Sequence, residues 1–228
     1  MIPIRDDNPV RGLPVVTPLL MLTCMGVYLW LLSLSPEARA EATTLLGFIP
    51  AVLFRHGSIY GSDPWVSPAG SIFTAMFVHG GFFHLAANML YLWIFGDNVE
   101  DRVGRGRFVA FYLICGAVAA LVQALPDMRS TVPMVGASGA VSGVLGAYLV
   151  LYPRANVLVA MPVLLARVPV LVMAALWFAG QLARSLLIEP GEVGVAFTAH
   201  VGGFIAGAVL VRWFVRDRRK RPTSQQPS

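Results

Sequence analysis

Six apolar stretches follow one another along the chain, separated by segments that carry most of its charged residues. About 20 residues of α-helix cross the hydrocarbon core of a bilayer, and most of these stretches approach or exceed that length. The pattern therefore predicts an all-α membrane protein built as a bundle of six spans. The expected spans are residues 13–34, 70–95, 108–125, 138–152, 168–188 and 195–215.

This pattern predicts three regions. Residues 1–12 form a cytoplasmic N-terminal segment, residues 13–215 form the six-span domain, and residues 216–228 form a basic and polar cytoplasmic tail. Acidic residues and prolines precede the first apolar stretch, which is unlike the start of a secretory signal peptide. We therefore expect the first span to be retained.

The composition supports a membrane location. Only 13% of the 228 residues are charged, 57% are hydrophobic, and the mean hydropathy is +0.70. Soluble domains carry roughly 25% charged residues, so this is an integral membrane protein rather than a soluble or nucleic-acid-binding one. Cys24 and Cys115 each lie within a predicted span, and we expect them to be buried as small apolar side chains.

The basic residues orient the predicted spans. With both termini in the cytoplasm, 13 of the 17 Lys and Arg residues fall in or next to inner segments, as the positive-inside rule requires. The four exceptions are Arg39, Arg55, Arg129 and Arg184.

The predicted first outer loop, residues 35–69, is long and rich in apolar side chains. Trp and Tyr are favoured at the membrane–water interface, so we expect the loop to lie partly in that interface. Its apolar residues include Phe48, Ile49, Val52, Leu53, Phe54, Tyr60 and Trp65.

Ser138 begins the fourth span, which is short. About 15 residues give a helix of about 22 Å, against a hydrocarbon core of about 30 Å. If the inner end lies at the cytoplasmic face, Ser138 lies below the outer surface, at the floor of a water-filled depression. Free N–H groups at a helix N-terminus also favour developing negative charge there. The alternative is that Ser138 only caps the helix.

His200 lies near the outer end of the sixth span, at a depth expected to match that of Ser138. A histidine can take the proton of a serine nucleophile, so a Ser-His dyad is the simplest candidate chemistry. Small residues would let the fourth and sixth spans approach closely. The glycines predicted to serve helix packing are Gly136, Gly139, Gly143, Gly203 and Gly207.

His84 and Asn88, at positions i and i+4 of the second span, share one helix face. Their N–H groups suit stabilisation of an oxyanion. A metal site would need more ligands at suitable spacing, so we predict neither metal nor cofactor. His79 is expected at the mouth of the site in a structural role.

A third, acidic member of the site is left open. The acids of residues 97–101 lie about 20 Å from His84 along a helix, which is too far. Three outer-loop acids remain candidates to assist His200: Asp127, Glu189 and Glu192.

The sequence resembles the bacterial six-span type of the rhomboid family of intramembrane serine proteases. The resemblance covers about residues 70–215 and includes the inner segment 96–107. It rests on three motifs in the family's order: His84-x-x-x-Asn88, Gly136-Ala137-Ser138-Gly139 and Ala199-His200-x-x-Gly203-x-x-x-Gly207.

The resemblance implies that Ser138 is the nucleophile and His200 the general base and then acid. It implies that Asn88, His84 and the Ser138 backbone N–H form the oxyanion hole. It also implies membrane-spanning protein substrates, cleaved near their outer end without a cofactor. Such a substrate must unwind at the cleavage site, and the fifth span, with Pro162 and Pro169 at its start, is the expected gate.

Two other functions remain as alternatives. A catalytically inactive relative would bind membrane clients without cutting them, but it would be expected to lack the serine or the histidine. A small transporter would be expected to show internal repeats and ionisable groups at the bilayer midplane, which this sequence does not show.

Overall fold

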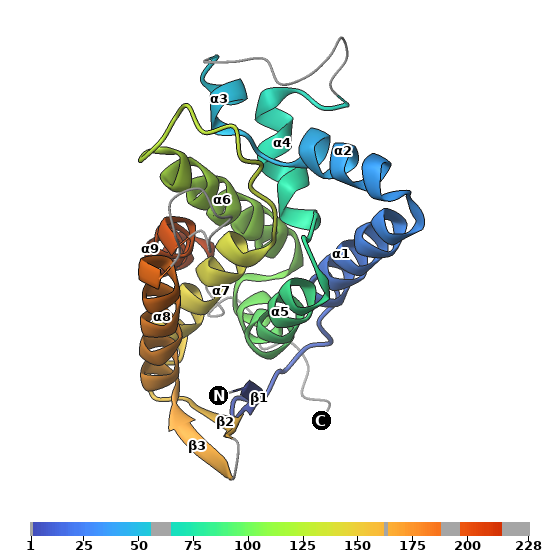
Figure 1. The fold of residues 1–228 in the computed structure, drawn as a ribbon. Coiled ribbons are helices and arrows are strands. Elements are labelled where there is room, and N and C mark those ends of the chain that lie inside the picture. The colour runs from blue at the N-terminus through green and yellow to red at the C-terminus, as the bar shows by residue number, and fades with distance from the viewer. Residues whose placement is uncertain (1, 56–64, 162–163, 188–196, 216–228) are drawn as a thin grey trace, which may run out of the picture.

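The computed structural model describes residues 2–55, 65–161, 164–187 and 197–215, and within that part the chain is mainly helical (Figure 1). Three strands form a small sheet at one end of the helices. The principal helices are α1 (Val16–Ser33), α2 (Pro36–Leu46), α5 (Phe82–Val103), α6 (Arg105–Ala124), α7 (Ser138–Leu151), α8 (Val170–Leu187) and α9 (Phe197–Phe214).

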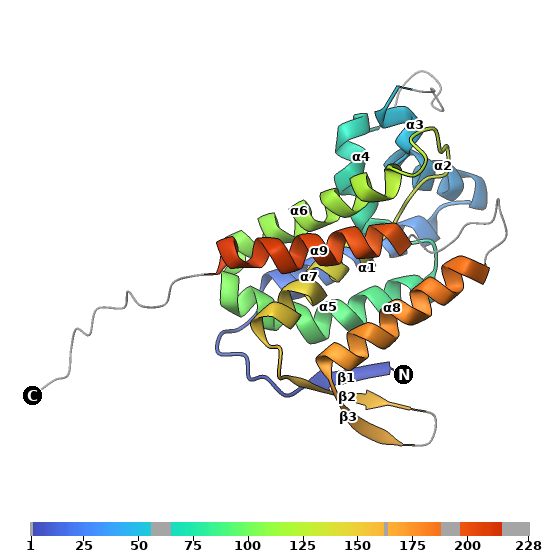
Figure 2. The same ribbon diagram turned by 90° about the vertical axis from the view of Figure 1, so that its left-hand side faces the viewer.

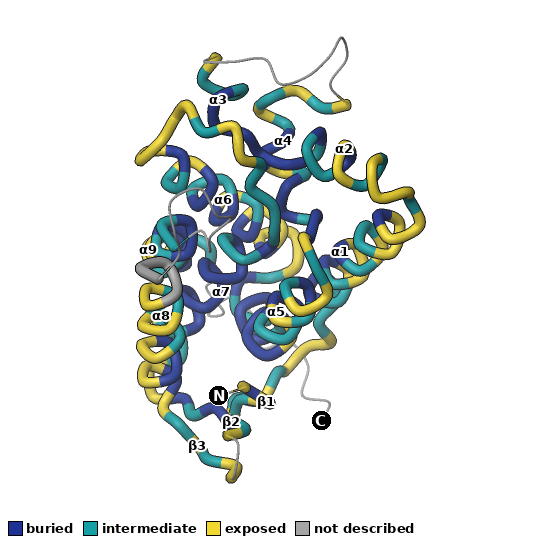
Figure 3. The backbone as a smooth tube through the Cα atoms, viewed as in Figure 1, coloured by how far each residue is buried: buried dark blue, intermediate teal, exposed yellow. Residues whose placement is uncertain are grey.

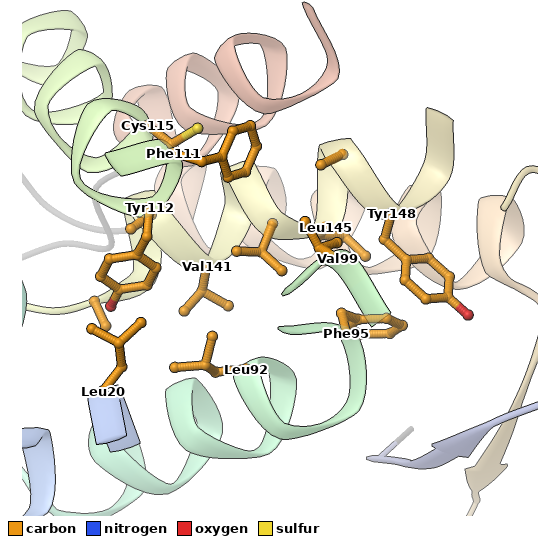
Figure 4. Close-up of a cluster of buried hydrophobic side chains, with 14 of the residues drawn as sticks. Leu20, Leu92, Phe95, Val99, Phe111, Tyr112, Cys115, Val141, Leu145 and Tyr148 are labelled. Atoms are coloured by element: carbon orange, nitrogen blue, oxygen red, sulfur yellow. The ribbon is translucent and has the colours of Figure 1, made fainter. Parts of the chain in front are cut away.

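Helix α7 lies at the centre of the bundle. Every residue from Ala140 to Tyr148 is buried, as expected for a helix that is apolar all round. It packs against α5, α6 and α9 (Figure 2). In the close-up, Val141 and Leu145 of α7 lie between Leu92 of α5 and Phe111 of α6 (Figure 4). The helix that begins at Ser138 is therefore held on several sides.

Five of the predicted helices are present, and no end differs from the prediction by more than three residues. By length and hydropathy, α1, α6 and α9 can each cross a membrane within the described part of the chain. Helix α7 and the apolar part of α8 are shorter, so the count of six spans stays a prediction.

The predicted second span is wrong in its boundaries. Residues 70–95 are divided between α4 (Pro68–Thr74) with the 3-10 helix η1 (Ala75–Phe77), and α5, and the two parts are bent by 83°. Val78 adopts an extended conformation, and Gly80 and Gly81 follow it. Two glycines disfavour helix, so the apolar pattern continues across a break in the backbone.

The polar segment that follows the predicted second span is almost entirely helical. Helix α5 continues to Val103, and α6 begins at Arg105. Gly104 between them has φ of +88°, a left-handed conformation that favours glycine. A single residue therefore turns the chain from one helix into the next.

The protein is mainly helical, as expected, but it also contains a small sheet that the all-α prediction did not include. Strands β1 (Ile2–Asp6), β2 (Asn156–Ala160) and β3 (Leu165–Pro169) form an antiparallel sheet in the order β1-β2-β3. The prediction placed no strand in residues 1–12 or in the segment after α7. Their pairing joins positions about 150 residues apart in sequence, which local patterns do not reveal.

The first loop contains helices α2 and α3 (Pro50–Leu53). Phe48 and Ile49, predicted to lie at the membrane interface, are instead buried in the protein. Phe48 pairs through its backbone with Met134, in the loop before α7. Trp65 is 57% exposed and contacts Trp30 of α1. Tyr60 lies outside the described residues.

Two polar contacts hold the ends of the helices that lie next to the sheet. The Glu100 carboxylate of α5 accepts hydrogen bonds from the backbone N–H groups of Val15, Val16 and Thr17, which cap the start of α1. Asp6 of β1 accepts a hydrogen bond from the Tyr148 hydroxyl of α7. The sheet and α1 are thereby attached to the central helices.

Candidate active site

Ser138 is the first residue of α7 and is partly buried. Gly136, with φ of +123°, turns the chain into the helix, and Ala137 is the N-cap. The Ser138 hydroxyl makes no side-chain cap, and within the described residues it forms no hydrogen bond. The serine is therefore not the helix cap that the alternative interpretation required.

The first turns of α7 and α9 are in backbone contact, as predicted from their glycines. A Cβ atom on Gly203 would overlap the carbonyl of Gly139, and one on Gly207 would overlap that of Gly143. A Cβ on Gly139 would lie 4.0 Å from the carbonyl oxygen of Ala199. Gly139 follows Ser138, and Ala199 precedes His200. Ser138 and His200 therefore lie on turns of α7 and α9 that face each other.

The His200 side chain is 4% exposed. Its Nδ1 atom is buried and has no hydrogen-bond partner among the described residues. The imidazole instead contacts the indole of Trp177 on α8, with ring centroids 5.3 Å apart and planes at 44°. Among the described residues, the neighbour of this ring is therefore an aromatic side chain and not a carboxylate.

Gln123 of α6 holds the start of α9. Its Oε1 atom accepts a hydrogen bond from the Ala199 backbone N–H at 3.0 Å and another from the Thr198 hydroxyl. Free N–H groups at a helix start need such partners. Gln123 therefore fixes the turn that carries His200.

His84 and Asn88 lie on one face of α5, as predicted. The Asn88 amide donates a hydrogen bond to the His84 backbone carbonyl at 2.9 Å, which leaves its second N–H available. The His84 ring lies against Gly136: a Cβ there would be 2.6 Å from His84 Cε1. The start of α5 is therefore next to the turn that leads into α7.

His79 is buried at 3% exposure, not located at a mouth. Its ring is 5.2 Å from that of His84, and its Nδ1 is 3.3 Å from the Phe77 carbonyl oxygen. These contacts fit the predicted structural role.

Of the three loop acids that were candidates to assist His200, none provides a partner for it in the described residues. Asp127 accepts a hydrogen bond from the Arg129 backbone. Glu189 and Glu192 lie outside the described residues. In the described part of the chain, His, Cys, Asp and Glu side chains form no group of three that could hold a metal ion.

Residues 68–217 match the family model of the rhomboid domain. The chain belongs to the rhomboid family. The match includes α4 to α9 and all four candidate residues, so the rhomboid domain contains the whole site described above.

Named relatives come from several kinds of organism. Rhomboid protein 1, mitochondrial, of Saccharomyces cerevisiae is 33% identical over 66% of this chain and 43% of its own length. Rhomboid protease GluP of Bacillus subtilis is 33% identical over 61% of this chain and 25% of its own. The mouse presenilin-associated rhomboid-like protein, mitochondrial, is 27% identical over 61% and 35%. The matched parts span less than half of each of these relatives.

Two residues at the site were missed by sequence reasoning. Gln123 is an amide in an apolar stretch, and an isolated polar residue of that kind is a signal for interhelical hydrogen bonding. Trp177 carried no signal, because a tryptophan in an apolar helix is equally compatible with contact to lipid.

Proposed function

We propose that this rhomboid protein is an intramembrane serine endopeptidase that cleaves membrane-spanning proteins through a Ser138–His200 dyad. The observation that carries the proposal is the glycine contact between α7 and α9, which brings the two residues onto adjacent turns. The Ser138 hydroxyl, which has no hydrogen-bond partner among the described residues, and the buried His200 ring support it.

In the proposed reaction, Ser138 Oγ attacks the scissile carbonyl carbon while His200 takes its proton. The tetrahedral intermediate collapses as the C–N bond breaks, and His200 returns the proton to the leaving amine. Water then attacks the acyl-enzyme with His200 as base, which releases the acid product and restores Ser138.

The oxyanion would be stabilised by the second N–H of Asn88, by His84 and by the Ser138 backbone N–H. Donors arranged in advance around a developing charge are among the largest contributions to catalysis. The position of Ser138 at the start of α7 supports this, because the first N–H groups of a helix have no partner within it. No cofactor enters the proposed steps.

The proposed substrate is a transmembrane helix cut near its outer end. A helix hides its carbonyls in backbone hydrogen bonds, so the cleaved segment must first unwind. Gly and Pro weaken helices, and substrates that contain them near the cut should react faster than poly-leucine helices.

The membrane arrangement that accompanies this proposal has six spans, both termini inside and the site open to the outside. The distribution of basic residues supports this orientation, and a bacterial plasma membrane is the proposed location. Helix α8 is the proposed gate for sideways admission of substrate. If a cross-link between α5 and α8 left cleavage of membrane substrates intact, the gate would lie elsewhere.

The deciding experiment is covalent labelling of the purified protein with a fluorophosphonate, followed by mass mapping of the adduct. We expect an adduct on Ser138 that is lost in Ser138→Ala and in His200→Ala. Ser142→Ala is the matched control, since Ser142 is one turn along the same helix and only donates to the Ser138 carbonyl. It should label normally.

Labelling of folded protein that does not depend on Ser138 would overturn the proposal. No adduct at all, in folded protein accessible to the probe, would instead favour the inactive, client-binding function. A transport activity would be detected by solute flux into liposomes, which the proposed protease should not support.

A further inference from the structure

We propose that Trp177 is a positioning residue that holds the imidazole of His200 in the orientation needed for proton transfer. The inference rests on the proposed function and concerns a residue on α8, outside the motifs that carry the family resemblance.

A general base needs a third group that fixes its ring. The His200 ring is almost fully buried, yet its Nδ1 atom has no hydrogen-bond partner in the described part of the chain. A ring without such a bond can rotate about its side-chain torsions unless packing prevents it. The indole of Trp177, 5.3 Å away between centroids, is the aromatic ring in contact with it.

Trp177 is itself fixed from two other helices. Its ring contacts Tyr91 of α5, with centroids 5.8 Å apart. The next residue, Phe178, contacts Phe204 of α9 at 4.9 Å, one turn beyond His200. These edge and tilted contacts have the geometry that aromatic rings prefer. The indole is therefore a rigid surface rather than a loosely placed side chain.

The position of α8 gives this contact its significance. Much of α8 is exposed in the bundle, including Leu171, Leu176 and Leu182, as Figure 3 shows by its colouring. Trp177 is partly buried and faces α5 and α9 instead. The orientation of the base thus depends on a helix at the edge of the bundle.

The test is the kinetics of fluorophosphonate inactivation, because a small probe does not need the bundle to admit a substrate helix. In Trp177→Leu we expect the limiting inactivation rate to fall about three- to tenfold, the fold-change that corresponds to one aromatic pair. The probe concentration for half-maximal rate should stay unchanged. Trp177→Phe keeps an aromatic ring and should restore most of the rate.

Two controls separate positioning from general structure. Tyr91→Leu removes one of the contacts that hold the indole but leaves the Trp177–His200 contact, so it should lower the limiting rate less than Trp177→Leu does. Trp93→Leu removes a tryptophan from α5 that is 55% exposed, and it should also behave as wild type. Trp177→Met, which fills the space without a ring, replaces Trp177→Leu if that variant does not fold.

A wild-type limiting rate in the ringless Trp177 variants would overturn the inference and leave the proposed function standing. So would an equal loss in Tyr91→Leu, which would assign the effect to the contact between α5 and α8. Absence of labelling in the wild type would instead overturn the proposed function itself.

Discussion

Gly207 of α9 and Gly143 of α7 are in direct backbone contact, so that a Cβ atom on Gly207 would overlap the Gly143 carbonyl group. Gly203 and Gly139 repeat this relationship one turn nearer the candidate site. The obstacle in each case is backbone, which cannot move aside as a flexible side chain can. The short distance between α7 and α9 therefore requires residues without a Cβ atom at these positions. The placement of Ser138 near His200 depends on that short distance.

We expect Gly207→Ala to force the two helices apart. Overpacking costs about 1–3 kcal/mol and occasionally more, and a rigid neighbour places this site at the upper end of that range. The thermal unfolding midpoint in detergent should fall, and Ser138 labelling should fall with it. Gly180→Ala on α8 is the matched control, because a Cβ there meets nothing within 4 Å. A Gly207→Ala protein as stable and reactive as wild type would show that the helices can separate at no cost.

Asn88→Ala should slow the proposed reaction by about 10²–10³-fold in kcat, the effect of losing one oxyanion donor. The side chain is 5% exposed, and one of its two N–H groups is already bonded to the His84 carbonyl. Asn88→Asp keeps the shape but supplies no amide donor, so it should be slow as well. Cleavage of a reconstituted membrane substrate gives the measurement, with KM expected to change little. Full activity in both variants would remove Asn88 from the oxyanion hole.

Glu100 provides a stability prediction away from the site. Its carboxylate accepts bonds from three backbone N–H groups at 2.8–3.0 Å and from the Thr17 hydroxyl. Glu100→Ala would leave those buried groups without partners, each at a cost of about 1–3 kcal/mol before water or rearrangement compensates. We expect a large loss in unfolding free energy, measured by denaturation in detergent. Glu37→Gln, an exposed carboxylate on α2, is the control and should have little effect.

Most helices could be predicted from the sequence, but the break before α5 and the contacts of Glu100 could not. Apolar stretches located α1, α6, α7, α8 and α9 because a helix pattern is local. The same apolar pattern hid the break before α5, since hydropathy does not register the turn at Gly80 and Gly81. Conversely, the role of Glu100 was not predictable, because its partners lie more than 80 residues earlier.

In the candidate site, too, local features could be predicted from the sequence and contacts between distant residues could not. His84 and Asn88 could be placed together because they are four residues apart on one helix, and the glycines predicted the contact between α7 and α9. Neither the contact of His84 with Gly136 nor that of Trp177 with His200 has a sequence signal. Both arise from the packing of helices that are distant in sequence, and that packing is a property of the whole bundle.

Asp6 gives a prediction for pH. Burial is the largest influence on this carboxyl group and raises its pKa above the usual 3.8, while hydrogen bonds from Tyr148 and Asn8 act in the opposite direction. Because its pKa is raised by folding, the folded protein binds the proton more tightly than the unfolded chain. The stability that this group contributes is therefore fully present below pH 3.8 and is lost as the pH rises through the raised pKa.

We therefore expect Asp6→Asn to flatten the dependence of stability on pH in the window just above 3.8. The amide keeps an oxygen that can accept a hydrogen bond from Tyr148, but it does not ionise in this pH range. Unfolding midpoints measured from about pH 3 to 7 in wild type and variant test this. Asp127→Asn, an exposed carboxylate in the loop before α7, controls for the loss of a surface charge. Equal slopes in wild type and Asp6→Asn would mean that the attachment of β1 to α7 does not depend on the protonation of Asp6.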